Sequence, residues 1–253
     1  MKTAKRPPLL LPLSCFHRSS SKNYKSQTQF CELYKVYGHP AGGILYLSDL
    51  SASQNSVLLE QHQIKTVINS CAILETYANY GYNEVPNIEY HKYYFEDPPD
   101  PTLYHKAICE ALPMINKKLS EGQNVLVHCY AGLSRSVGIV AAYLTVYAYN
   151  FLCSWRQQDF GNELQNDNSP DTKHNNSPSL SEEHLSSPGY LPIVFKYLET
   201  VKEIDPKLTV IMFIQDLEQS LSSTSASDHD RISIWNNIYC GTSHSKINND
   251  LLD

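Results

Sequence analysis

Short apolar blocks separated by polar turns run through the middle of the chain, and each block has a length typical of a strand or a helix. Five runs rich in Val, Ile, Leu and Tyr predict strands, at Leu33–Val36, Ile44–Leu47, Lys65–Asn69, Glu89–Phe95 and Asn124–His128. The intervening and following segments predict helices at Asn55–Gln61, Leu103–Leu119 and Arg135–Tyr149. This alternation predicts an α/β domain in which helices flank a mostly parallel central sheet.

Three polar segments interrupt that pattern. Residues 1–29 are basic and rich in serine, residues 156–189 are rich in Asn, Ser, Asp and Pro, and residues 219–253 are rich in serine. Segments of this composition bury too little apolar surface to fold alone. The sequence therefore predicts a domain at 30–218, with a disordered insertion at 156–189 and disordered tails at 1–29 and 219–253.

One apolar stretch, Val137–Trp155, contains no charged residue and is about long enough to span a bilayer. It also carries three tyrosines and Asn150, and it directly follows a polar loop. We interpret it as a buried central helix and expect no membrane partner.

Charge and cysteine content narrow the function classes. The formal net charge of −6 argues against a nucleic-acid groove. The seven cysteines are widely spaced and form no CxxC pair, so they suggest neither a disulfide framework nor a zinc site. We expect a cytoplasmic or nuclear protein that uses no metal and no cofactor.

The clearest chemical signal lies between the last predicted strand and the helix that follows it. Residues 128–136 read His-Cys-Tyr-Ala-Gly-Leu-Ser-Arg-Ser, with five residues between Cys129 and Arg135. The N–H groups of such a loop, and the dipole of the helix, attract an anion and stabilise a thiolate. Arg135 offers a planar fork for two phosphate oxygens, and Gly132 permits a tight turn. A buried, inert cysteine beside an ordinary turn is the alternative.

These residues resemble the signature of a known family. The pattern His128-Cys129-x-x-Gly132-x-x-Arg135-Ser136 is similar to that of the cysteine-dependent protein phosphatases, and the string from Val127 to Ser136 resembles their dual-specificity branch, which includes the MAP kinase phosphatases and small atypical enzymes. The resemblance covers residues 30–150, and more weakly 190–217, where the family's Pro-Asn pair is absent. It implies a protein-tyrosine-phosphatase-like fold.

The resemblance also implies roles for individual residues. Cys129 would be the nucleophile that forms a phosphocysteine, and Ser136 would stabilise its sulfur as a leaving group. His128 and Asn69 would support the loop, although a histidine beside a nucleophile can also act as its base. The substrate phosphate would be bound by loop residues Tyr130, Ala131, Gly132, Leu133, Ser134 and Arg135.

A general acid is needed to protonate the leaving oxygen. The stretch that ends the fourth predicted strand offers Asp97, 32 positions before Cys129, and Asp100. We predict Asp97 as the acid, as the family's acid loop implies, with Asp100 as the second choice. Either residue could instead form an ordinary turn beside the prolines.

Cys71 follows the third predicted strand, whose carboxyl end should lie near the catalytic loop. Some family members have a similarly placed cysteine that forms a reversible disulfide. Cys71 is therefore predicted to capture oxidised Cys129 and protect it. A packed core cysteine is the alternative.

The loop carries no lysine, so the substrate predicted for this site is a singly phosphorylated protein side chain. The first functional hypothesis is a dual-specificity phosphatase acting on phosphotyrosine and on phosphoserine or phosphothreonine, with MAP kinases as candidate substrates. A catalytically weak phosphate-binding scaffold of the same fold is the second. A lipid or RNA 5′-end phosphatase is the third, and the uncharged loop weighs against it.

The N-terminal tail adds one candidate partner site. Basic Lys5 and Arg6, followed by apolar Leu9 and Leu11, resemble a MAP kinase docking peptide. A featureless tail explains the same residues. A mitochondrial transit peptide is the third interpretation, because the tail is basic and contains no acid, although its prolines disfavour an amphipathic helix.

Overall fold

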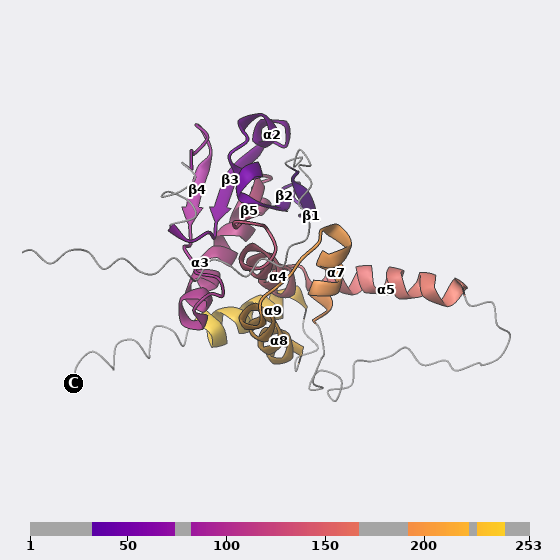
Figure 1. Cartoon of the computed structure of the whole chain (residues 1–253). Helices are drawn as coiled ribbons and strands as arrows, with labels where there is room; N and C mark the ends of the chain where they lie inside the picture. The colour runs from indigo at the N-terminus through magenta and orange to yellow at the C-terminus, as the bar shows by residue number, and fades with distance from the viewer. Residues whose placement is uncertain (1–31, 74–81, 167–191, 223–226, 241–253) are drawn as a thin grey trace, which may run out of the picture. The chain divides into compact units, whose positions relative to one another are not determined.

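The computed structural model describes residues 32–73, 82–166, 192–222 and 227–240 (Figure 1). Five strands form one sheet in the order β1-β2-β5-β3-β4. β1 is antiparallel to β2, and all other neighbouring pairs are parallel, which confirms the predicted mostly parallel α/β architecture. The strands are β1 (Tyr34–Gly38), β2 (Ile44–Ser48), β3 (Ile64–Asn69), β4 (Glu89–Lys92) and β5 (Asn124–His128).

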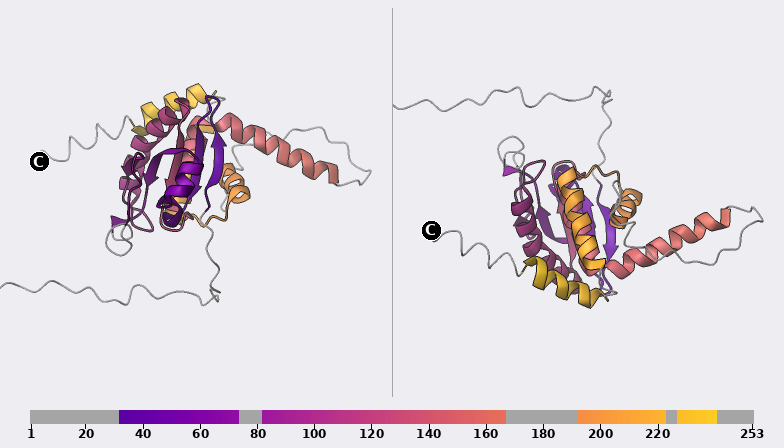
Figure 2. Two further views of the ribbon diagram at one scale, coloured as in Figure 1. Left: turned by 90° about the horizontal axis from the view of Figure 1, so that it is seen from above. Right: turned by 90° about the horizontal axis from the view of Figure 1, so that it is seen from below.

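Helices cover both faces of this sheet. A small group, α1 and α2, packs on one face with the side chains of Tyr46, Val67 and Leu126. A larger group packs on the other face around α4 (Figures 1 and 2). The helices are α1 (Leu50–Ser53), α2 (Ser56–Gln61), α3 (Pro101–Ser120), α4 (Arg135–Tyr147), α5 (Tyr149–Asn166), α7 (Ile193–Val201), α8 (Leu208–Ser222), α9 (Asp228–Ile234) and the π-helix η3 (Trp235–Cys240).

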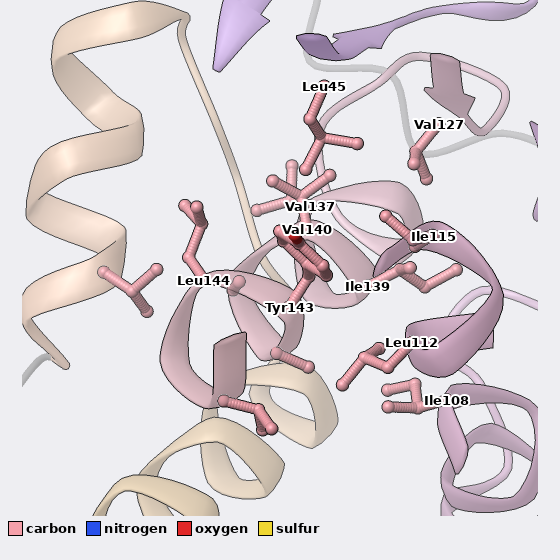
Figure 3. Close-up of a cluster of buried hydrophobic side chains, with 14 of the residues drawn as sticks. Leu45, Ile108, Leu112, Ile115, Val127, Val137, Ile139, Val140, Tyr143 and Leu144 are labelled. Carbon is pink, nitrogen blue, oxygen red and sulfur yellow. The ribbon is translucent and has the colours of Figure 1, made fainter. Parts of the chain in front are cut away.

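Helix α4 is the centre of the main core. Twelve of its residues are buried, so it is apolar on all sides and contacts α3, α5, α7, α8 and α9. Figure 3 shows Val137, Val140 and Tyr143 of α4 among side chains from the sheet and α3. A Cβ added at Gly138 would lie 2.6 Å from Cγ1 of Val210, so α8 packs closely on α4 even though the family's Pro-Asn pair is absent.

The predicted apolar helix is divided in two. Helix α4 ends at Tyr147, and α5 begins at Tyr149 at an angle of 94°. The guanidinium of Arg231 lies at this break, where its Nε donates to the carbonyl of Thr145 at 3.1 Å and its Cζ is 3.6 Å from the ring centroid of Tyr149. Local sequence did not indicate this break, because Arg231 lies far along the chain.

Among the described residues, no single helix is long and apolar enough to cross a bilayer. The bent pair formed by α4 and the first part of α5 meets the length and hydropathy criteria only when the two helices are taken together.

The predicted C-terminal tail needs correction. Residues 219–253 were predicted to be disordered, but α8 continues to Ser222, and α9 and η3 follow at 228–240. Ser227 and Asp230 form a capping box that starts α9, and Trp235 and Arg231 are buried. Although this segment is rich in serine, it contains a few apolar side chains, such as that of Trp235, that pack on the main core.

The other polar segments are only partly described. Helix α5 continues to Asn166, so the first third of the predicted insertion at 156–189 is helical. The rest of that insertion to 189, and the whole predicted tail at 1–29, lie outside the described residues. The domain boundaries therefore stay predictions.

Candidate active site

The motif loop, residues 129–134, connects the carboxyl end of β5 to the first turn of α4. Cys129 directly follows β5, Ser134 is the N-cap of α4, and Arg135 is its first residue. Gly132 has φ +69°, and a Cβ there would lie 2.6 Å from the carbonyl oxygen of Ser48. Only glycine meets both demands, so the turn that aims the loop amides depends on this residue.

The sulfur of Cys129 is buried and has a hydroxyl donor. Ser136 donates from Oγ to Sγ of Cys129 at 3.2 Å, and both residues are buried. A donor in this position stabilises negative charge on the sulfur, whether the thiolate is free or leaving phosphorus. The structure thus brings together the two residues for which the sequence predicted this contact.

Arg135 is buried and connects the loop to two other segments. Its Nη1 donates to the carbonyl of Phe95 at 3.0 Å, and its own carbonyl accepts from the hydroxyl of Tyr104 at 2.9 Å. Phe95 stands two residues before Asp97, and Tyr104 lies in the first turn of α3. These contacts connect the loop at residues 129–135 to the segment that carries the predicted acid.

The two candidate acids differ in what they already bind. Asp100 is the N-cap of α3, and its Oδ1 accepts from the backbone N–H of Leu103 at 2.9 Å. Asp97 is exposed. Asp100 therefore has a structural role as the N-cap of α3, whereas Asp97 lies at the surface just before this helix.

His128 is buried beneath the loop. Its Nε2 is 3.3 Å from the hydroxyl of Tyr82, and its Nδ1 is 3.3 Å from the carbonyl of Cys129 and 3.9 Å from Sγ of Cys71. Burial is the main cause that lowers the pKa of His128 to about 4. A neutral imidazole held in this way supports the loop and is poorly suited to act as a base near pH 7.

Asn69 is the last residue of β3 and pairs with His128 across the sheet. Its Oδ1 accepts from the N–H of Cys71 at 2.9 Å, and Ser70 donates from Oγ to the carbonyl of His128 at 2.8 Å. Asn69 thus shapes the turn beside the loop, and Ser70, which the sequence reading missed, makes the direct bond to the residue before Cys129.

The burial of His128 predicts an acid-sensitive fold. The imidazole has a pKa near 6.5 in the unfolded chain and about 4 in the folded protein, so the unfolded state binds more protons between these values and stability falls as pH decreases. We expect the free energy of unfolding to drop by about 3 kcal/mol between pH 7 and pH 4 because of this residue. Urea unfolding of wild type and His128→Gln at both pH values measures it. The variant should be less pH-dependent, and equal slopes for the two proteins would contradict the assignment.

A distant segment supports the loop from outside. The N–H groups of Asp205 and Lys207 donate to the carbonyl of Leu133 at 2.9 Å and to Oγ of Ser134 at 3.0 Å. The nearby Lys202 is half-buried, and burial lowers its pKa, while electrostatic interactions with Asp49 and Cys129 act in the opposite direction. Sequence reasoning missed Lys202, because it lies 73 residues after Cys129 and belongs to no motif.

The remaining loop residues are divided between surface and interior. Tyr130 and Ala131 are exposed, whereas Gly132 and Ser134 are buried. The carbonyl of Tyr130 accepts from the N–H of Leu50 at 3.1 Å, which holds the exposed part of the loop against α1. Cys71 is buried and packs in one cluster with Cys129, Leu50 and Tyr82.

Comparison with known proteins agrees with this geometry. Residues 45–152 match the family model described as the dual specificity phosphatase catalytic domain. Dual specificity protein phosphatase 18 of Pongo abelii is 33% identical over 107 residues, which cover 41% of this chain and 51% of that protein. The Rattus norvegicus protein of the same name is 32% identical over 105 residues, covering 41% and 47%. The chain thus spans about half the length of the curated relatives it matches.

Parts of several solved structures are also similar to this chain. The human tyrosine phosphatase-like serine/threonine/tyrosine-interacting protein is 20% identical, with a TM-score of 0.48 over 74% of this chain and 95% of that one. A mouse putative dual specificity phosphatase complexed with zinc tungstate is 17% identical, with a TM-score of 0.47 over 79% and 94%.

Proposed function

Because residues 45–152 match the model of the dual specificity phosphatase catalytic domain, we propose that this protein hydrolyses phosphotyrosine and phosphoserine or phosphothreonine in other proteins. One observation carries the proposal. The sulfur of Cys129 accepts a hydrogen bond from Ser136 at the N-terminus of α4, where Arg135 begins the helix. A thiolate, a donor for it and a guanidinium in one short loop suit attack on a phosphate.

The proposed reaction has two steps. The thiolate of Cys129 attacks phosphorus, and the carboxyl group of Asp97 gives its proton to the departing side-chain oxygen, which leaves a phosphocysteine and a free hydroxyl. The Asp97 carboxylate then takes a proton from water, whose oxygen attacks phosphorus. The P–S bond breaks, inorganic phosphate departs, and Ser136 donates to the released thiolate.

The loop would stabilise charge in both steps. Backbone N–H groups from Tyr130 to Arg135, together with the Arg135 guanidinium, would bind the non-bridging oxygens. Support for this comes from the tertiary contacts of the loop: Gly132 lies close to the backbone of Ser48, and the N–H of Asp205 donates to the carbonyl of Leu133. Preorganised donors stabilise a transition state better than mobile ones, since they need not reorganise during reaction.

A singly phosphorylated side chain best fits a loop that carries a single positive charge. Among loop residues 130–135 only Arg135 is charged, and the half-buried Lys202 adds a positive charge nearby. Action on MAP kinases in the cytoplasm or nucleus belongs to the same proposal. The residues that suggest kinase docking, Lys5, Arg6, Leu9 and Leu11, lie outside the described residues.

A substrate panel tests the proposed function. The full chain is incubated with phosphotyrosine and phosphothreonine peptides, a phosphoinositide and a triphosphate-ended RNA, and released phosphate is measured. We expect kcat/KM for the peptides to exceed that for the lipid and RNA at least about tenfold, because one guanidinium suits a single phosphate. A preference for lipid or RNA would contradict the proposal. Phosphopeptide binding without release of phosphate would instead favour the catalytically weak scaffold.

We also propose that Cys71 protects the nucleophile. A peroxide would oxidise the Cys129 thiolate to a sulfenic acid, and the Cys71 thiol would displace water from it to form a disulfide. The support is that Cys71 and Cys129 share one buried cluster, in which Sγ of Cys71 lies 3.9 Å from Nδ1 of His128.

A further inference from the structure

Two cysteines from distant parts of the chain meet outside the active site. Cys109 lies in the middle of α3, and Cys240 is the last residue of η3, 131 positions later. Both residues pack against the main core, both are partly exposed, and their side chains interact. In the two views of Figure 2 the yellow C-terminal helices lie beside α3, in agreement with the contacts between α3 and η3.

The contact does not depend on the sulfurs alone. The ring of His105, one turn before Cys109, lies 6.3 Å from Trp235 and 5.9 Å from Tyr239. Trp235 is buried and stacks on Tyr239 with 5.2 Å between ring centroids. This aromatic cluster packs η3 against α3, and this packing holds Cys240 near Cys109.

A second anchor comes from α8. The hydroxyl of Tyr239 is 3.1 Å from Oδ2 of Asp216 and 2.8 Å from Oγ of Ser220. Tyr239 directly precedes Cys240, so these bonds hold the chain at the residue that carries the thiol. The thiol pair therefore sits at the junction of α3, α8 and η3.

The interaction between the two thiols makes them chemically unequal. It lowers the pKa of Cys240 and, together with burial, raises the pKa of Cys109. Thiolate character controls attack on peroxides and disulfides. Cys240 is thus the thiol suited to react first, and Cys109 is suited to resolve the product.

We propose that Cys109 and Cys240 form a reversible disulfide that fastens the C-terminal segment of α9 and η3 to α3 when the protein meets a peroxide. The thiolate of Cys240 attacks the peroxide O–O bond and becomes a sulfenic acid, while the peroxide is reduced to water. The thiol of Cys109 then attacks that sulfur, its proton leaves with the hydroxyl as a second water, and the S–S bond forms. Two electrons pass from the two sulfurs to one peroxide.

The expected consequence is a more stable fold. A disulfide joins sulfurs about 2.05 Å apart, so it would hold η3 firmly against α3, which it already contacts. Closing a loop of 131 positions restricts the unfolded chain strongly. Because α3 also holds the catalytic loop through Tyr104 and Arg135, the bond would keep this support folded while Cys129 itself is oxidised.

Peptide mapping of the full chain tests the proposal. The protein is treated with hydrogen peroxide, free thiols are alkylated, and the digest is analysed by mass spectrometry and compared with thermal unfolding. We expect a peptide pair joined at Cys109 and Cys240, and a Tm about 5 °C or more above that of the reduced protein, reversed by dithiothreitol. Cys109→Ser and Cys240→Ser should lose the rise, and the control Cys153→Ser, in another partly exposed helix, should keep it.

Two results would overturn the proposal. One is that Cys109 and Cys240 both stay as free thiols, and are therefore alkylated afterwards, at a peroxide dose that fully oxidises Cys129. The other is that Cys240 pairs with a cysteine other than Cys109. If the serine variants do not fold, the map of the wild-type chain alone still decides between these outcomes. The same map shows whether Cys71 joins Cys129, and that pair succeeds or fails independently.

Discussion

Cys129→Ser is expected to lower kcat/KM for a small aryl phosphate by a factor on the order of 10⁵. A serine hydroxyl must lose its proton to attack phosphorus, and Asp97, which carries its own proton in this step of the proposed reaction, cannot accept it. Ser136 is a donor, and neutral His128 faces Tyr82 and a backbone carbonyl. Initial rates over a range of substrate concentrations measure the loss.

Two controls separate lost chemistry from lost structure. Cys153→Ser replaces a cysteine of α5 that lies outside the motif, so its kcat/KM should match wild type within about a factor of two. Acid quenching of wild type during turnover should trap phosphate on Cys129, as a phosphocysteine intermediate requires. Residual activity of Cys129→Ser above about one hundredth of wild type would mean that another nucleophile does the work.

Asp97→Asn is expected to lower kcat by about 10² to 10⁴ for a substrate with a poor leaving group, such as phosphothreonine. The amide keeps the shape of the side chain but cannot give a proton to the leaving oxygen. For an aryl phosphate whose leaving group needs no proton, the loss should be much smaller. Comparing kcat for the two substrates measures the contribution of the acid.

Asp100→Asn is the matched control for this prediction. Asparagine is as good an N-cap as aspartate, so the bond to the N–H of Leu103 and the start of α3 should persist. Its kcat should stay close to that of wild type for both substrates. If Asp100→Asn lost more activity than Asp97→Asn, the acid would have been assigned to the wrong carboxyl group.

The site shows which structural features a local sequence pattern can predict. Cys129, Gly132, Arg135 and Ser136 lie within eight consecutive residues, and the strand before them and the helix after them are strongly apolar. Their relative placement follows from one strand, one turn and one helix N-terminus. That is why the contact between Ser136 and Cys129 could be predicted from the sequence.

Assignment of the acid needed more than spacing. Both Asp97 and Asp100 stand beside prolines after an apolar strand, and the sequence favoured Asp97 only through a resemblance. The N–H of Leu103 donates to Asp100, which makes that residue a helix cap, and Arg135 donates to the carbonyl of Phe95, which connects the Asp97 segment to the loop. The second of these joins residues 40 positions apart, which no local pattern encodes.

By itself the sequence determined the order of strands and helices, the alternation that buries Leu45 and Leu47 on one face of β2 and Tyr46 on the other, and the motif loop. Tertiary structure alone decided that the serine-rich C-terminal segment folds, that α4 breaks before Tyr149 over Arg231, and that Lys202 lies near Cys129. The physical reason is how far apart along the chain the interacting residues lie. Periodicity and capping act between residues a few positions apart, whereas these features depend on single side chains that meet only when the chain closes on itself.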